Sequence, residues 1–132
     1  DIRSLEVTGM VSHVAALPQI RQGLCDLQRQ MASYANVVME GRDIGTVVLP
    51  RASYKFFLTA SAEVRAMRRY QELIAKGREV DYSRILAQLT ERDHLDSSRE
   101  YAPLRKADDA IEIDTSNLNI AEVIRLILSK IK

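Results

Sequence analysis

The sequence predicts an α/β fold in which helices flank a small parallel sheet. Predicted elements follow one another in the order helix–helix–strand–strand–helix–helix–strand–helix. The three strand candidates are interpreted as buried and not as alternating strands, which is typical of a parallel sheet covered on both faces. At 132 residues, with 46% hydrophobic and 28% charged residues, the chain fits a single domain over residues 1–132 with a real core.

Two helices are predicted in the first quarter of the chain. Residues 1–16 favour a helix in part, and this pattern breaks at Pro18. Proline suits the first turn of a second helix, where its missing N–H is not needed. This second helix ends near Ser33 and carries an apolar stripe at spacings of three and four residues, formed by Ile20, Leu24, Leu27 and Met31.

The three predicted strands are short. Residues 37–39 form an apolar run before Gly41, residues 54–58 follow a turn signal at Pro50, and residues 110–113 are the third strand candidate. Three strands make a small sheet, so we expect sequence outside these residues to supply a further part of it. An incomplete sheet exposes an edge, which allows self-association with a second copy.

The remaining helices have recognisable ends. Residues 61–76 are helical and arginine-rich and stop before Gly77, which suits the position after a helix. Asp81 is a predicted N-cap for the next helix. The last helix begins near Asn119, with Glu122 at capping-box spacing. The helix after Asp81 presents Ile85, Leu86 and Leu89.

Composition excludes several classes of protein. The net charge of +1 argues against a protein that coats nucleic acid, because such domains carry a large basic excess. The apolar runs are too short to span a membrane. Cys25 is the single cysteine, so no intramolecular disulfide forms, and a cytoplasmic setting is expected. The chain begins at Asp1 and not at Met, which indicates sequence upstream of it.

Residues 40–46 (EGRDIGT) are the first candidate site, because ligands bind beyond the carboxyl ends of strands in open α/β sheets. Arg42 can bind a phosphate through two N–H groups, and Asp43 can accept hydrogen bonds from an amino group. A loop with a surface Arg–Asp pair is the alternative. His13 and His94 are interpreted as ordinary polar residues.

Two further groups of charged residues lie on predicted helices. Arg92, Asp96 and Arg99 share one helix face. They form either a solvent-exposed salt-bridge ladder, which their spacing alone favours, or a site for phosphate and ribose. Arg65, Arg68 and Arg69 form either a solvated basic face or a cluster that covers a triphosphate during phosphoryl transfer.

Taken together, the segments GRDIGTVVLP, YKFFLTAS, RAMRR, ERDHLDSSREYAPL and ADDAIEIDTS resemble the bacterial cytidylate kinases in order and spacing, over essentially all of residues 1–132. The resemblance implies a P-loop nucleoside-monophosphate-kinase fold, incomplete at its N-terminus. Residues 1–33 would belong to the CMP-binding region, residues 61–100 to the lid and the remainder to the core.

The resemblance also implies an activity, the transfer of a phosphoryl group from ATP, with Mg²⁺, to CMP or dCMP. Ser12, Arg21 and Asp43 match positions that recognise cytosine, and Arg42 and Arg99 match phosphate-binding arginines. Arg92 and Asp96 match positions near the ribose and α-phosphate. The catalytic lid arginines would be Arg65, Arg68 and Arg69. No metal ligand is assigned to this chain.

The sequence departs from the family in one respect. No G-x-x-x-x-G-K-[ST] loop occurs in the 132 residues, although such a loop binds the phosphates of ATP. ATP and Mg²⁺ would therefore be held mainly by sequence outside this chain, and we expect the chain alone to be inactive. The alternatives are a non-catalytic CMP-binding module and a structural fragment.

Overall fold

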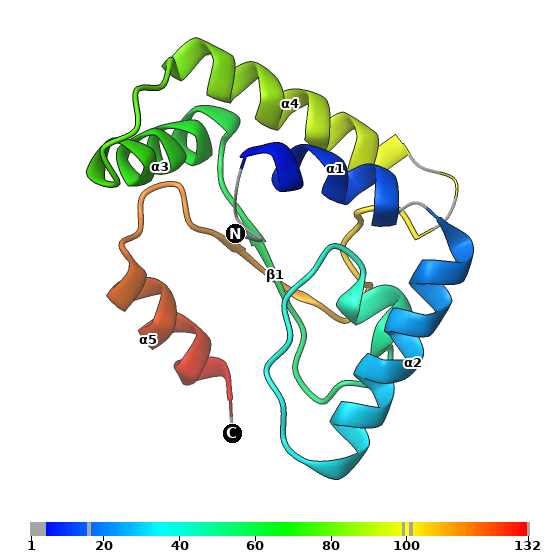
Figure 1. The fold of residues 1–132 in the computed structure, drawn as a ribbon. Coiled ribbons are helices and arrows are strands. Elements are labelled where there is room, and N and C mark those ends of the chain that lie inside the picture. Colours follow the sequence, from blue (N-terminus) through cyan, green and yellow to red (C-terminus); the bar gives the residue numbers. More distant parts are fainter. Residues whose placement is uncertain (1–4, 16, 99, 101, 132) are drawn as a thin grey trace. The chain divides into compact units, whose positions relative to one another are not determined.

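The computed structural model describes residues 5–15, 17–98, 100 and 102–131. Helices alternate with two parallel strands (Figure 1), which confirms the predicted α/β fold class. In chain order the elements are α1 (Leu5–Ala15), α2 (Pro18–Tyr34), the π-helical turn η1 (Ile44–Val48), β1 (Phe56–Thr59), α3 (Ala62–Ala75), α4 (Tyr82–Ser98), β2 (Ile111–Asp114) and α5 (Ile120–Lys130).

The chain forms two compact units. The first consists of Asp1–Ala52 and Arg92–Arg105, and the second of Ser53–Glu91 and Lys106–Lys132. The first therefore contains α1, α2, η1 and the C-terminal part of α4, while the second contains the sheet, α3, the start of α4 and α5. The expectation of one domain over residues 1–132 remains a prediction.

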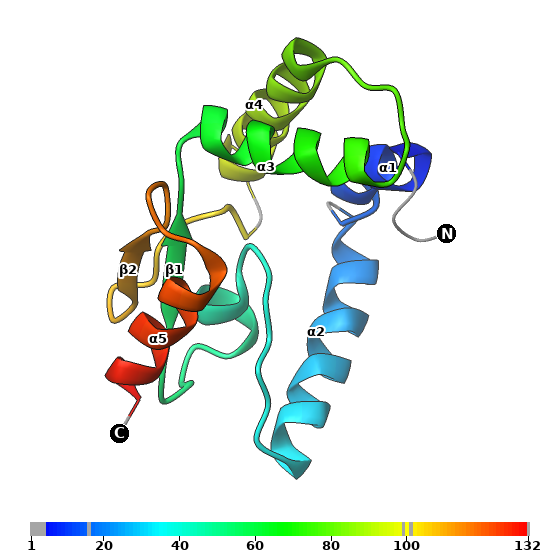
Figure 2. The same cartoon turned by 90° about the vertical axis from the view of Figure 1, so that its left-hand side faces the viewer.

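The sheet of the second unit consists of β1 and β2, which lie side by side (Figure 2). The two strands run parallel, with Phe56 opposite Ile111 and Thr59 opposite Asp114. Strands thus form at both predicted places, residues 54–58 and 110–113, with boundaries shifted by one or two residues. The expectation that these strands are buried is wrong for the described residues, because Ile113 is the one residue of the two strands that is buried there. Within the described residues each strand pairs only with the other. One edge of each strand is therefore open.

The prediction of a buried strand at residues 37–39 is wrong for this structure. The segment is neither helix nor strand, and the side chain of Val38 is fully exposed. A strand forms only where neighbouring backbone groups accept and donate its hydrogen bonds. The described residues supply no such neighbour here, so high β-propensity alone does not produce a strand.

The core of the second unit lies between α3 and the start of α4. Ala66, Leu73 and Ile85 are buried there. The rings of Tyr70 and Tyr82 meet edge to face, with centroids 6.2 Å apart, which is a favourable aromatic geometry. Leu86 and Leu89, named from the sequence together with Ile85, pack against this cluster as partly buried side chains. The other partly buried residues of the cluster are Tyr70, Val80 and Tyr82.

The predicted helix ends are confirmed. The Asp81 carboxylate accepts a hydrogen bond from the backbone N–H of Arg84 at 2.7 Å. Asn119 and Glu122 form the expected capping box, because each side chain accepts from the other residue's backbone N–H. Gly77 adopts a φ of 70° after α3, a conformation that glycine tolerates best.

The apolar stripe of α2 is exposed. Ile20, Leu24, Leu27 and Met31 are all more than 40% exposed. The helix is amphipathic as predicted, but no described element covers its apolar side. None of the described helices is both long and apolar enough to cross a membrane.

Arg68 links α3 to the segment after β2. Its guanidinium donates to Thr115 Oγ1 at 3.1 Å, to the Thr115 carbonyl at 2.5 Å and to the Leu118 carbonyl at 3.2 Å. Thr115 is buried, so its carbonyl depends on protein partners. Arg69, the next residue, instead bonds the exposed carboxylate of Glu72 on its own helix.

This difference predicts unequal effects on stability. Arg68→Met removes three hydrogen bonds and should lower the free energy of unfolding by about 1–3 kcal/mol. The matched control Arg69→Met loses one exposed helical pair, worth about 0.2–0.5 kcal/mol. Urea denaturation of both variants measures this, and equal effects would contradict the structural role of Arg68.

Candidate functional site

The segment after residue 40 closes into a π-helical turn in the first unit. The carbonyl of Asp43 accepts from Val47 N at 2.8 Å and from Val48 N at 3.2 Å. Leu49 N donates to the carbonyl of Ile44 at 2.7 Å, completing the wide turn. Isolated π-helical turns are rare and occur frequently at functional sites. The predicted loop is therefore a hydrogen-bonded turn with Asp43 at its start.

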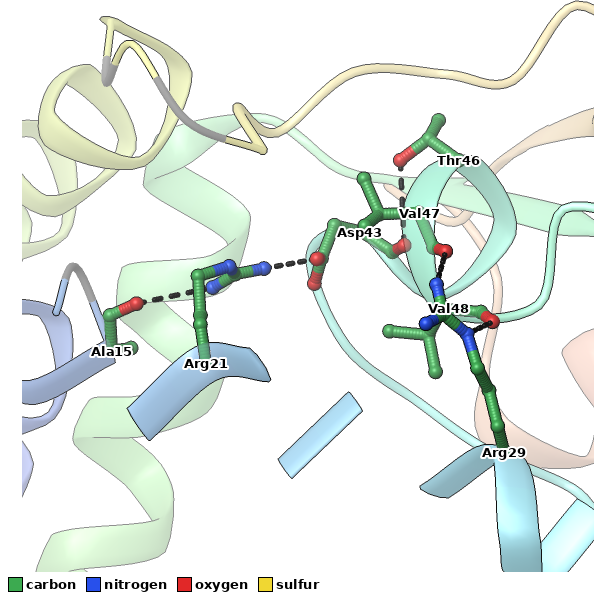
Figure 3. A network of polar contacts seen from close by, with 7 residues as sticks. All are labelled: Ala15, Arg21, Arg29, Asp43, Thr46, Val47 and Val48. Carbon is green, nitrogen blue, oxygen red and sulfur yellow. Dashed lines mark hydrogen bonds and ion pairs between the residues drawn. The ribbon is translucent and has the colours of Figure 1, made fainter. Parts of the chain in front are cut away.

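Asp43 forms a buried ion pair with Arg21 of α2 (Figure 3). Both residues are 8% exposed, and Arg21 Nη1 also donates to the carbonyl of Ala15 at 3.2 Å. Charged groups are tolerated at this depth only when they are paired and hydrogen-bonded. The alternative of a surface Arg–Asp pair within the loop is wrong for Asp43, because this carboxylate is buried and its ion-pair partner is Arg21.

A second arginine of α2 contacts the far end of the same turn. Arg29 Nε donates to the carbonyl of Val48 at 3.0 Å, and Arg29 Nη2 donates to the carbonyl of Val47 at 2.8 Å (Figure 3). Sequence reasoning missed this residue. The signal that could have found it is its spacing of eight residues from Arg21, which places both arginines on one side of the helix.

The neighbouring Arg42 contacts α4. Its Nε donates to Asp96 Oδ2 at 3.0 Å, and Arg92, one turn before Asp96, lies 3.7 Å from the same oxygen through its Nε. The Asp96 side chain is only 3% exposed. The interpretation of this helix face as a solvent-exposed ladder is therefore wrong for Asp96, which is buried between two cations from separate segments.

Two predicted site residues cannot be placed with their side chains. Arg99 lies outside the described residues, and Ser12 belongs to α1 but its side chain is not described. The remaining residues of the predicted substrate site lie together in the first unit. These are Arg21, Arg42, Asp43, Arg92 and Asp96.

The predicted lid arginines belong to the second unit and contact other protein groups. Arg65 Nε donates to the carbonyl of Ala60 at 3.0 Å, while Arg68 donates to Thr115 and Leu118. Hydrogen bonds from Lys76 and Arg69 lower the pKa of Glu72 to about 2. Glu72 is therefore ionised at neutral pH and pairs with Arg69. The catalytic role of these arginines remains a prediction.

The charged residues of the first unit suit the binding of a polar, anionic ligand. Guanidinium groups donate to phosphate and hydroxyl oxygens, and carboxylates accept from amino and hydroxyl groups. Arg92 Nε is buried and has no hydrogen-bond partner among the described residues. Among the described residues of the chain, no group of three or more His, Cys, Asp or Glu side chains could hold a metal ion.

The buried position of Asp96 predicts a large effect of its neutralisation. Asp96→Asn keeps the shape but removes the negative charge between Arg42 and Arg92, and should lower the free energy of unfolding by about 1–3 kcal/mol. Asp26→Asn is the matched control, since the Asp26 side chain is 60% exposed and pairs weakly with Arg29 at 3.5 Å. Thermal denaturation compares them, and an Asp96→Asn variant as stable as the control would refute the buried cluster.

Comparison with known proteins supports the resemblance in sequence. The family described as Cytidylate kinase matches residues 1–132. Relatives named cytidylate kinase include those of Carboxydothermus hydrogenoformans (53% identical, 96% of this chain, 57% of the relative) and Fervidobacterium nodosum (54% identical, 100% of this chain, 60% of the relative). The chain thus spans less than two thirds of their length. Because the family match runs through the whole chain, the chain belongs to the cytidylate kinase family.

Proposed function

We propose that this chain provides the nucleoside-monophosphate site of an ATP:CMP phosphotransferase. The observation that carries the proposal is the gathering of two buried carboxylates, Asp43 and Asp96, with three arginines in the first unit. In a member of the cytidylate kinase family, these groups are suited to hold CMP or dCMP for phosphorylation to the diphosphate.

Asp43 is the proposed reader of the cytosine amino group. Its Oδ2 bonds Arg21, and a carboxylate has about four acceptor positions, so the group retains capacity for a further donor. The ion pair also fixes where the carboxylate lies, because Arg21 is itself bonded to the carbonyl of Ala15. A fixed acceptor favours cytosine, which offers an N–H₂ group, over uracil, which offers a carbonyl at that place. Ser12 would complete this set.

Arg42 and Arg92 are the proposed groups for the phosphate and ribose end, together with Arg99. Asp96 orients both guanidinium groups from between them and could accept a ribose hydroxyl. The Arg42 side chain is 43% exposed, so it is accessible to a ligand from solvent. The Arg92 side chain is 31% exposed, so part of it is also accessible to a ligand.

ATP and Mg²⁺ are not assigned to a site in this chain. The sequence contains no G-x-x-x-x-G-K-[ST] loop, and the described residues offer no metal-ligand cluster. We infer that Arg65, Arg68 and Arg69 approach the triphosphate only if their present hydrogen bonds rearrange. We also propose a cytoplasmic location, because Cys25 forms no disulfide. We further propose that two copies of the chain can associate through an open edge of the sheet.

The alternative is a structural fragment in which the ion pairs only stabilise the fold. The mutual pairing of Arg21 with Asp43 and of Arg42 with Asp96 is the observation that favours it. Neutralising Asp43 would then leave nucleotide affinity unchanged, whereas the site interpretation requires a selective loss.

Asp43→Asn should weaken CMP binding by about 10- to 100-fold and reduce the preference for CMP over UMP, because the amide presents a donor where the carboxylate only accepts. Isothermal titration calorimetry with CMP, UMP and AMP measures this. Asp26→Asn serves as the control at an exposed carboxylate. Equal losses for CMP and UMP would show that Asp43 does not read the base.

A polypeptide of these 132 residues should bind CMP but not phosphorylate it at a useful rate. The physical reason is that phosphoryl transfer depends on positioning and charge neutralisation around ATP, and this chain supplies no phosphate-binding loop for it. A coupled assay with CMP, ATP and Mg²⁺ tests this. Turnover comparable to that of an intact cytidylate kinase would contradict the prediction.

A further inference from the structure

Helix α2 holds the turn that begins at Asp43 by two separate arginines. Arg21 binds the side chain of Asp43 before the turn, and Arg29 binds the carbonyls of Val47 and Val48 at its end (Figure 3). Eight residues of helix separate the two arginines, which corresponds to about 12 Å along the axis. The turn is therefore anchored at both ends to one rigid element.

The contacts of Arg29 satisfy groups that the turn cannot satisfy itself. The last carbonyls of a helical segment have no partner within that segment, and a cation beside them is favourable. Val48 is 2% exposed and its bond to Arg29 is partly buried, whereas the bond from Arg29 to the Val47 carbonyl is exposed. The planar guanidinium can serve both carbonyls at once, which a lysine ammonium on its flexible stem does less well.

We propose that Arg29 is a positioning residue for nucleotide recognition, acting through the turn on Asp43. This inference rests on the proposed function, in which Asp43 reads the cytosine amino group. The Arg21–Asp43 and Arg42–Asp96 pairs both hold the start of the segment, so neither of them holds the far end of the turn at Val47 and Val48. Arg29 holds that end and keeps the Asp43 carboxylate in one place relative to α2.

The test compares Arg29→Met and Arg29→Lys with the control Asp26→Asn in the 132-residue chain. The control removes the weak ion pair of Arg29 with Asp26, at 3.5 Å, and leaves both carbonyl contacts in place. Amide hydrogen exchange is followed in a peptide covering residues 43–49. The amides of α1 and α5 serve as internal references for unfolding of the first and the second unit.

Arg29→Met should speed exchange in residues 43–49 by about tenfold while exchange in α1 and α5 is unchanged, and Arg29→Lys should have a smaller effect. Calorimetry should show CMP affinity falling about tenfold and UMP affinity falling less, so that base discrimination is reduced. A purely structural role would not change the ratio of the two affinities.

Unchanged exchange in residues 43–49 of Arg29→Met would overturn the proposal, and so would faster exchange with an unchanged CMP-to-UMP ratio. If Arg29→Met also speeds exchange in α1 or α5, Arg29→Lys, which keeps the charge and one donor group, replaces it in the same comparison. If the unmodified chain binds no CMP, the proposed function fails at that step. The hydrogen-exchange measurement then shows separately whether Arg29 holds the turn.

Discussion

The ion pair between Arg21 and Asp43 joins α2 to the start of the π-helical turn, and the arrangement of the first unit depends on it. Both groups lie at 8% exposure, where a lone charge would be strongly unfavourable. The pair is compatible with burial because Arg21 also bonds the carbonyl of Ala15 at the end of α1. One guanidinium therefore connects α1, α2 and the turn.

The two adjacent residues Arg42 and Asp43 contact different helices. Asp43 contacts α2 through Arg21, while Arg42 contacts α4 through Asp96. A dipeptide held in this way has little freedom to change its backbone, because a rotation that kept one contact would break the other. Pre-organisation of this kind lowers the entropic cost of ordering side chains around a ligand.

The described residues also leave surfaces that have the character of a protein interior. The apolar stripe of α2 and the β-branched residues Val37 and Val38 are exposed. Amphipathic helices and apolar strands contribute to stability only when another element covers them. The chain spans less than two thirds of the length of its relatives, and within the described residues no element performs that covering.

Local interactions explain what the sequence by itself determined: the α/β class, the helix ends at Asp81 and Asn119, and the family, whose motifs are contiguous. Only the tertiary structure decided that Asp96 is buried between Arg42 and Arg92, that Arg29 binds the turn, and that residues 37–39 form no strand. The physical reason is the separation along the sequence between the residues that interact. Caps and turns depend on residues three or four positions apart, whereas burial, ion pairing across 54 residues and strand pairing depend on which distant segments meet.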